Sequence, residues 1–172
     1  RRTGSIGCAD IGLMGQIGSV LTGVGEVYYR GLRRKTADVF AELGMVPIKL
    51  APRDALASLS VNGVGYAASA VAVRDAARVL RVLMATALMS SATLGAARAP
   101  WRSAITVGCA TQSQVGRWLT ETSADWQWND ASHVQDPLSL RMLPQIFGVA
   151  IAEISRIGEV ILKATGRSDD NP

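Results

Sequence analysis

The spacing of apolar and polar residues predicts helices joined by short polar connections. Residues 11–28 interleave apolar side chains with glycines, which lets another helix approach closely but requires tertiary support. Residues 35–43 have helical spacing and are followed by Gly44, a typical helix end. A loop is expected over residues 45–54, because a proline follows shortly after that glycine.

The middle of the chain predicts one long helix. After Asn62 and Gly63 an apolar run continues to about residue 95, and its charged residues gather on one part of the cylinder. The charge-free stretch 55–73 is long enough to span a membrane, but it contains serines, glycines and an asparagine. It is therefore predicted to be a buried helix with its lead-in loop, and the whole run is predicted to be too long and apolar for a surface helix.

The last third of the chain predicts two more helices. Residues 96–106 are expected to be a connection, residues 113–120 a short helix and residues 123–133 a polar loop. A third long helix is expected from 137 to 166, bent at Pro144, which cannot donate a backbone hydrogen bond. No repeat or linker interrupts this pattern, so residues 1–172 are predicted to be a single all-α segment of elongated helices lying side by side.

The composition supports this class and narrows the function. The 172 residues are 48% hydrophobic and only 5% aromatic, which favours closely packed helices over a β-sandwich and allows one real core. The net charge is only +4, and the basic residues form small groups without interleaved aromatics. No nucleic-acid partner and no membrane are therefore expected.

The cysteines and the single histidine exclude common metal and disulfide frameworks. Cys8 and Cys109 lie about a hundred residues apart, so they form no zinc-binding spacing, and no metal site is predicted. The first residues lack the apolar core of a signal peptide. A reducing, cytoplasmic location fits these features best.

Motifs in family order resemble those of the aromatic amino acid ammonia-lyases and aminomutases, the histidine, phenylalanine and tyrosine ammonia-lyase-like family. The family patterns are G-S-V-G-A-S-G-D-L with a later G-E-G, L-A-L-L-N-G, V-Q-D-P-Y-S-L-R with a following P-Q, and S-D-N-P. The matching segments are residues 4–11 with 23–26, 56–63, 134–141 with 144–145, and 168–172. The third match is long and specific, and the four together span the chain.

The resemblance implies a mostly helical homotetramer in which several subunits build each active site. It also implies an electrophile made from the chain's own residues, methylidene-imidazolone, and no external cofactor. The family removes ammonia from an aromatic amino acid or moves it to the neighbouring carbon. A small-molecule amino acid is therefore the expected substrate.

The resemblance assigns the electrophile to Gly7, Cys8 and Ala9, counting back from Asp10 with one residue deleted upstream. The third residue's amide nitrogen must attack the first residue's carbonyl, and the middle side chain must then lose a leaving group, here hydrogen sulfide. Ala9 opposes this closure, because its Cβ crowds a position that is glycine in the family. If the gap lies elsewhere, Ala9 takes the middle position and no ring can form. Separately, Cys8 has an alternative as a small buried apolar residue.

The resemblance also assigns substrate-binding residues. Arg141 matches the arginine that grips the substrate carboxylate, which a planar guanidinium binds in bidentate fashion; its alternative is an ion pair within the bundle. Asn62, Gln135 and Asn171 match polar pocket residues, and each has an alternative as a helix cap or turn residue. Leu138 departs from the family, which commonly has tyrosine there.

Three functions therefore compete. The first is an ammonia-lyase or aminomutase-like protein that needs missing segments or a companion chain, because the family continues beyond these residues at both ends. The second is a repurposed or inactive relative without the electrophile, acting as an isomerase or cyclase or as a structural partner subunit. A helical interaction module is a third reading, which needs only the apolar helices.

Overall fold

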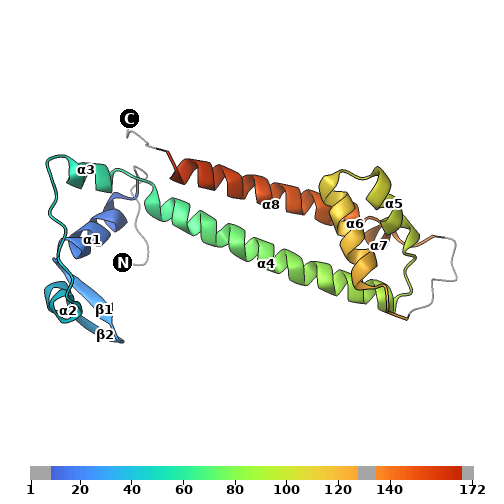
Figure 1. Cartoon of the computed structure of the whole chain (residues 1–172), viewed down its shortest axis with the longest axis horizontal. Coiled ribbons are helices and arrows are strands. Elements are labelled where there is room, and N and C mark those ends of the chain that lie inside the picture. Colours follow the sequence, from blue (N-terminus) through green and yellow to red (C-terminus); the bar gives the residue numbers. More distant parts are fainter. Residues whose placement is uncertain (1–8, 128–134, 168–172) are drawn as a thin grey trace. The chain divides into compact units, whose positions relative to one another are not determined.

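The computed structural model describes residues 9–127 and 135–167 (Figure 1). The chain divides into two compact units, one of residues up to 69 together with those from 163 onward, and one of residues 70–162. The predicted all-α class is confirmed, with one small hairpin added, whereas the single segment over residues 1–172 stays a prediction. The elements are α1 (Ile11–Leu21), β1 (Glu26–Tyr29), β2 (Leu32–Lys35), α2 (Thr36–Leu43), α3 (Asp54–Leu59), α4 (Gly63–Thr93), α5 (Ala99–Val107), α6 (Ala110–Thr122), α7 (Leu138–Arg141) and α8 (Leu143–Thr165).

The first unit contains a β-hairpin that the helical pattern did not predict. Helix α1 ends at Leu21 and not near residue 28, because Gly23 and Gly25 adopt positive φ angles that no helix uses. Strands β1 and β2 pair antiparallel, from Glu26 opposite Lys35 to Tyr29 opposite Leu32. Arg30 and Gly31 form the turn with φ angles of 51° and 79°, as the tight hairpin turns require.

Helix α2 carries the small core of this first unit. Thr36, Val39 and Phe40 are its buried residues. The helix ends at Gly44 in the left-handed conformation, with φ 65°, which confirms the predicted end. Residues 45–53 contain neither helix nor strand, so the predicted loop is also confirmed.

Helix α4 confirms the long helix, but the prediction that it is buried is wrong for the described part of the chain. Residues 55–59 are helical and not a loop, and no residue between 55 and 73 is buried. Only Met84, Leu88 and Ser91, all in the second half of α4, are buried. By length and composition alone Asp54–Thr93 can cross a membrane, but one such segment is weak evidence, because core helices of soluble proteins also meet this criterion.

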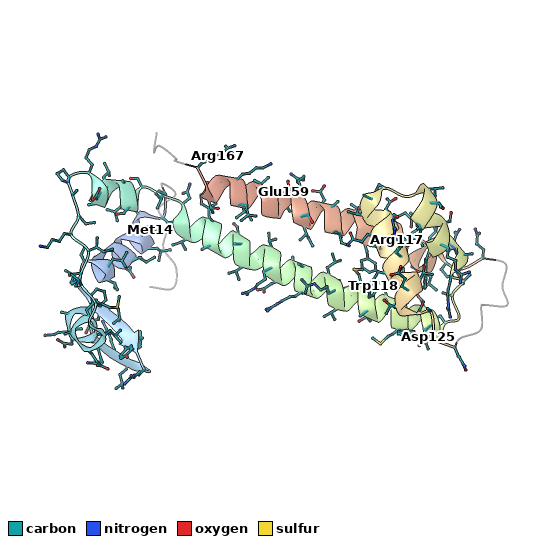
Figure 2. All side chains as sticks on the ribbon, in the orientation of Figure 1. Met14, Arg117, Trp118, Asp125, Glu159 and Arg167 are labelled. Carbon is teal, nitrogen blue, oxygen red and sulfur yellow. The ribbon has the colours of Figure 1, made fainter. Side chains whose placement is uncertain are left out.

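The core of the second unit lies where α5 and α6 meet the ends of α4 and α8. Its buried apolar residues are Met84, Leu88, Ala96, Trp101, Val115, Leu119, Leu143 and Phe147. The predicted connection over residues 96–106 is therefore wrong in part, since α5 begins at Ala99, with Pro100 in its first turn, where a missing N–H costs nothing. Trp118 of α6, labelled in Figure 2, packs against this cluster.

The last helical run is interrupted at Met142. Helix α7 is one turn long, Met142 departs from helical geometry with φ −94° and ψ 15°, and α8 begins at Leu143. Met142 still donates to the carbonyl of Leu138 and accepts from the N–H of Ile146, both at 2.9 Å. Pro144 explains the interruption, because it has no N–H to donate to the carbonyl of Leu140. At the other side, Gly148 brings α8 against α6: a Cβ there would lie 2.9 Å from the Cα of Gln112.

Candidate functional site

Two of the four family-like segments meet in the first unit. The backbone N–H of Asp10 donates to the carbonyl of Val61 at 3.0 Å, and its carboxylate accepts from the N–H of Gly65 at 2.9 Å. Asp10 therefore satisfies one of the free N–H groups at the start of α4 and places negative charge at the positive end of the helix. The residue after the predicted electrophile is thus fixed beside Asn62.

The predicted residues of this unit are only partly described. Gly7, Cys8 and Asn171 lie outside the described residues. Ala9 adopts φ 50°, the left-handed region that favours glycine. Asn62 directly precedes α4 and is exposed; its carbonyl accepts from the N–H of Tyr66 at 2.9 Å, and its side-chain amide makes no hydrogen bond within the described chain. Its backbone carbonyl therefore accepts the first hydrogen bond of α4, while its side-chain amide can contact a ligand.

The second unit holds Arg141 on α7. Its Nε donates to the carbonyl of Asp136 at 2.8 Å, and the side chain is half-buried. Within the described residues its terminal nitrogens have no hydrogen bond and no ion pair. The predicted alternative, an ion pair inside the bundle, is not found there. The carbonyl of Asp136 fixes the Nε side of the guanidinium, and toward the described residues the outer edge has no partner, as an anion-binding arginine requires.

The neighbours of Arg141 are built differently. Gln135 is exposed, whereas Asp136 is only 6% exposed and its Oδ2 accepts from the backbone N–H of Ala97 at 2.7 Å. Leu138 is 60% exposed and presents no polar atom. Residues 135–141 therefore provide one guanidinium, on Arg141, and one exposed side-chain amide, on Gln135. The buried Asp136 fixes them to the segment before α5.

Sequence reasoning missed Trp101 and Arg98, which hold this region together. The indole N–H of Trp101 donates to the carbonyl of Leu140 at 2.9 Å. Arg98 donates to the carbonyls of Ser123 at 3.1 Å and Trp126 at 2.9 Å, closing the end of α6. One signal was available in the sequence: a buried tryptophan needs an acceptor, and Pro144 leaves the carbonyl four residues earlier without its helical donor.

The cavities do not coincide with the predicted residues. A cavity of about 450 Å³ between α4, α6 and α8 is lined mostly by apolar side chains, with Arg81, Gln114 and Ser155 as its polar groups. A shallower hollow of about 550 Å³ lies along α1 and residues 24–26. Among the described residues of the predicted site, Ala9, Asn62, Gln135 and Arg141, none lines either one. The case for a site rests on the geometry of Arg141 and not on these cavities.

Two perturbed groups lie away from the predicted site. A hydrogen bond from Arg34 lowers the pKa of the exposed Glu42 carboxyl, and the charges of Arg34 and Arg30 add to this. The hydrogen bond with Thr111 lowers the pKa of the exposed Cys109 thiol, which begins α6. Among the described residues no three histidine, cysteine or acidic side chains come together as a metal site would require.

Comparison with known proteins places the chain in context. The family model described as aromatic amino acid lyase matches residues 1–172. The histidine ammonia-lyases of Burkholderia multivorans and Burkholderia vietnamiensis are each 31% identical over 180 residues, which cover 98% of this chain and 35% of theirs. The chain thus spans about a third of the curated relatives it matches.

Solved structures show the same fold. Ergothionase from Treponema denticola, an ergothioneine-degrading enzyme, superposes with a TM-score of 0.84 at 24% identity, covering 99% of this chain and 35% of that one. The phenylalanine aminomutase of Pantoea agglomerans gives a TM-score of 0.77 at 22% identity, covering 99% of this chain and 37% of that one. At such identities the likeness establishes the fold alone.

Proposed function

Because the chain belongs to the aromatic amino acid lyase family, we propose that it supplies the carboxylate-binding part of a site that eliminates or shifts ammonia on an aromatic amino acid. The observation that carries this proposal is the arrangement of Arg141. Its Nε is held by the carbonyl of Asp136, and its outer nitrogens have no partner within the described residues. A guanidinium held in this way offers two parallel N–H donors to a carboxylate.

The remaining substrate contacts are proposed from motif position. Asn62 offers a side-chain amide beside Asp10, and Gln135 offers one beside the buried Asp136. Asn171 is proposed for the same role by its place in the last family-like segment. Amides of this kind orient a substrate, because each presents both a donor and an acceptor.

The residues of the triad do not fit the family's self-made ring well. Ala9 carries a Cβ at φ 50°, a conformation that is strained for any residue with a side chain. The middle residue is cysteine in place of serine, so the ring requires the loss of hydrogen sulfide. No catalytic step is therefore derived through this group.

The same observations favour a second candidate. In it the chain is a repurposed or inactive relative without the electrophile, acting as an isomerase or cyclase or as a structural partner. Leu138 supports this candidate as well, because it is exposed where the family commonly has tyrosine, and it offers no proton.

For both candidate functions, we propose that further copies of this chain or a companion chain complete the protein. Large apolar side chains stay exposed along both long helices, including Val79, Val82 and Leu83 of α4 and Ile157 and Val160 of α8. Exposed apolar surface of this kind drives association, and family membership favours protein partners over a membrane. A cytoplasmic location is proposed with it.

Carboxylate binding tests the proposal. Trans-cinnamate and its uncharged counterpart cinnamamide are titrated into the wild-type chain, into Arg141→Gln and into Arg102→Gln, a change at an exposed arginine of α5. Arg141→Gln is expected to weaken cinnamate binding by about tenfold or more, because a charge-assisted pair is lost, and to leave cinnamamide unaffected. Equal affinity of wild type and Arg141→Gln for cinnamate contradicts the proposal.

The intact mass separates the two candidates. A deficit of one water plus one hydrogen sulfide, mapped by peptide analysis to Gly7, Cys8 and Ala9, establishes the electrophile and favours the lyase or aminomutase. An unmodified mass excludes ring formation in this chain and leaves the repurposed relative ahead.

A further inference from the structure

Helix α7 cannot support itself. It contains only four residues, Leu138–Arg141, and Met142 links it to α8 by donating to the carbonyl of Leu138 and accepting from the N–H of Ile146. A single helical turn is unstable alone, because its few hydrogen bonds do not offset the ordering of the backbone. The direction of Arg141 must therefore be set by contacts from outside α7.

The first outside contact fixes the residue before the turn. Asp136 is buried, and its carboxylate accepts from the N–H of Ala97, which lies just before α5. The carbonyl of the same residue accepts from Nε of Arg141. Asp136 thus contacts both the residue Ala97, just before α5, and the guanidinium of Arg141.

The second outside contact fixes the end of the turn. Trp101 is fully buried in α5, and its indole N–H donates to the carbonyl of Leu140, directly before Arg141. That carbonyl is free to accept because Pro144 has no N–H. The segment around α5 therefore holds α7 at both ends, through Ala97 and Trp101.

We propose that Asp136 and Trp101 are positioning residues: they hold α7 at both ends and thereby orient the guanidinium of Arg141. The inference rests on the proposed function, since aiming matters only if Arg141 binds the substrate carboxylate. Two contacts at opposite ends of one turn fix both its position and its rotation. A carboxylate-binding arginine needs this preorganisation, because bidentate pairing requires a defined orientation.

Two pairs of variants separate positioning from general stability. Trp101→Phe keeps most of the packing but removes the indole donor, and Trp118→Phe is its match, because Trp118 packs on the same core and its indole has no hydrogen bond within the described residues. Asp136→Ala removes the acceptor for Ala97. Asp136→Asn keeps an oxygen at that place and is the rescuing variant.

The readout is hydrogen exchange of the Arg141 Nε–H in the full chain, followed by nuclear magnetic resonance. We expect Trp101→Phe and Asp136→Ala to accelerate this exchange by about tenfold or more, because the donor then leaves its carbonyl more often. Asp136→Asn and Trp118→Phe are expected to stay within about twofold of wild type. If Trp101→Phe fails to fold, the comparison of Asp136→Ala with Asp136→Asn tests the inference by itself.

Two results overturn the inference: unchanged exchange in Asp136→Ala, or equal acceleration in Trp101→Phe and Trp118→Phe. Adding trans-cinnamate to the same samples tests the function separately. If cinnamate leaves the Arg141 signals of the wild type unmoved, the proposed function fails even where the exchange results support the positioning role. The two failures are therefore distinguishable.

Discussion

The two units of the chain stabilise their functional residues in different ways. In the second unit, Arg141 donates to the carbonyl of Asp136, and Trp101 of the buried cluster donates to the carbonyl of Leu140, directly before Arg141. The first unit has a small core on α2 and holds Ala9 and Asn62 at one backbone junction through Asp10. The segment around Arg141, proposed to bind the carboxylate, is thus packed by the chain itself, whereas the described residues around Asp10 include no buried side chain.

This difference shows what a family-like segment needs in order to act. In the motif at residues 134–141, the described residues from 135 onward are supported by neighbours within the same unit, so their geometry is set before any partner arrives. Of the motif at residues 4–11 the structure describes residues 9–11, where Asp10 contacts Val61 through its N–H and Gly65 through its carboxylate. The predictions below test this contrast, beginning with the largest expected effect.

The largest effect is expected in the core of the second unit. Leu119 is 0% exposed and Leu43 of the first unit is 49% exposed. Leu119→Ala should cost about 2–5 kcal/mol of unfolding free energy because it leaves a cavity, and Leu43→Ala should cost less than about 1 kcal/mol. Urea unfolding measures both, with tryptophan fluorescence reporting on the second unit and circular dichroism on the whole chain. Equal losses of unfolding free energy in the two variants would contradict the difference in packing between the two units.

A second effect is expected at the contact between α8 and α6. A Cβ on Gly148 would lie 2.9 Å from the backbone of Gln112, whereas a Cβ on Gly158 meets only Val73 at 3.8 Å. Gly148→Ala should therefore cost about 1–3 kcal/mol through overpacking. Gly158→Ala in the same helix should stabilise by about 0.5–1 kcal/mol through helix propensity. Thermal unfolding of both checks this, and a stabilising Gly148→Ala would refute the close contact.

A smaller effect is expected in the first unit, at Asp10. Asp10→Ala removes the acceptor for the N–H of Gly65 and should cost about 0.5–2 kcal/mol, as other helix caps do. Asp10→Asn keeps an acceptor and should recover most of this loss. Amide hydrogen exchange at Gly65 is the direct measurement, and slow exchange in Asp10→Ala would show that the cap is not needed.

The smallest effect is the pH dependence of the surface pair Arg34–Glu42. The folded pKa of Glu42 is lowered, chiefly by the hydrogen bond from Arg34. The pair therefore stabilises the fold above the unfolded pKa of about 4.3, and this contribution is lost as the pH falls through the lower folded value. Glu42→Gln should lower the melting temperature slightly at about pH 7 and not at about pH 3. Thermal melts across this range check it; a difference that grows at acidic pH would have the wrong sign.

Local patterns in the sequence predicted the elements that depend on local interactions. Gly44 ends α2 and Gly63 begins α4 because helix ends are set by residues within one turn. The hairpin of β1 and β2 was missed because the helical pattern was extended to residue 28, although Val27, Tyr28 and Tyr29 favour strands and Arg30 and Gly31 formed a turn signal. Helix α5 was missed because Pro100 was taken as a break and not as a helix start.

The candidate site was predictable only where a single residue carries the signal. Arg141 was found through its motif, and the lack of a partner for its outer nitrogens among the described residues agrees with the predicted role without testing it. Trp101 and Asp136 were missed as its supports, because a hydrogen bond between residues about forty positions apart depends on the tertiary fold. The prediction that α4 is buried failed for a similar reason: apolar composition does not say whether the same chain or another one packs against the helix.

Hydrogen exchange along the wild-type chain tests the contrast between the two units most directly. We predict that the amides of α5 and α6 open only with global unfolding of their unit, whereas those of α1 and α3 exchange faster through local opening. This result would mean that the chain preforms the surroundings of Arg141 and leaves the electrophile side to be completed. Equal protection of α1 and α6 would contradict the account.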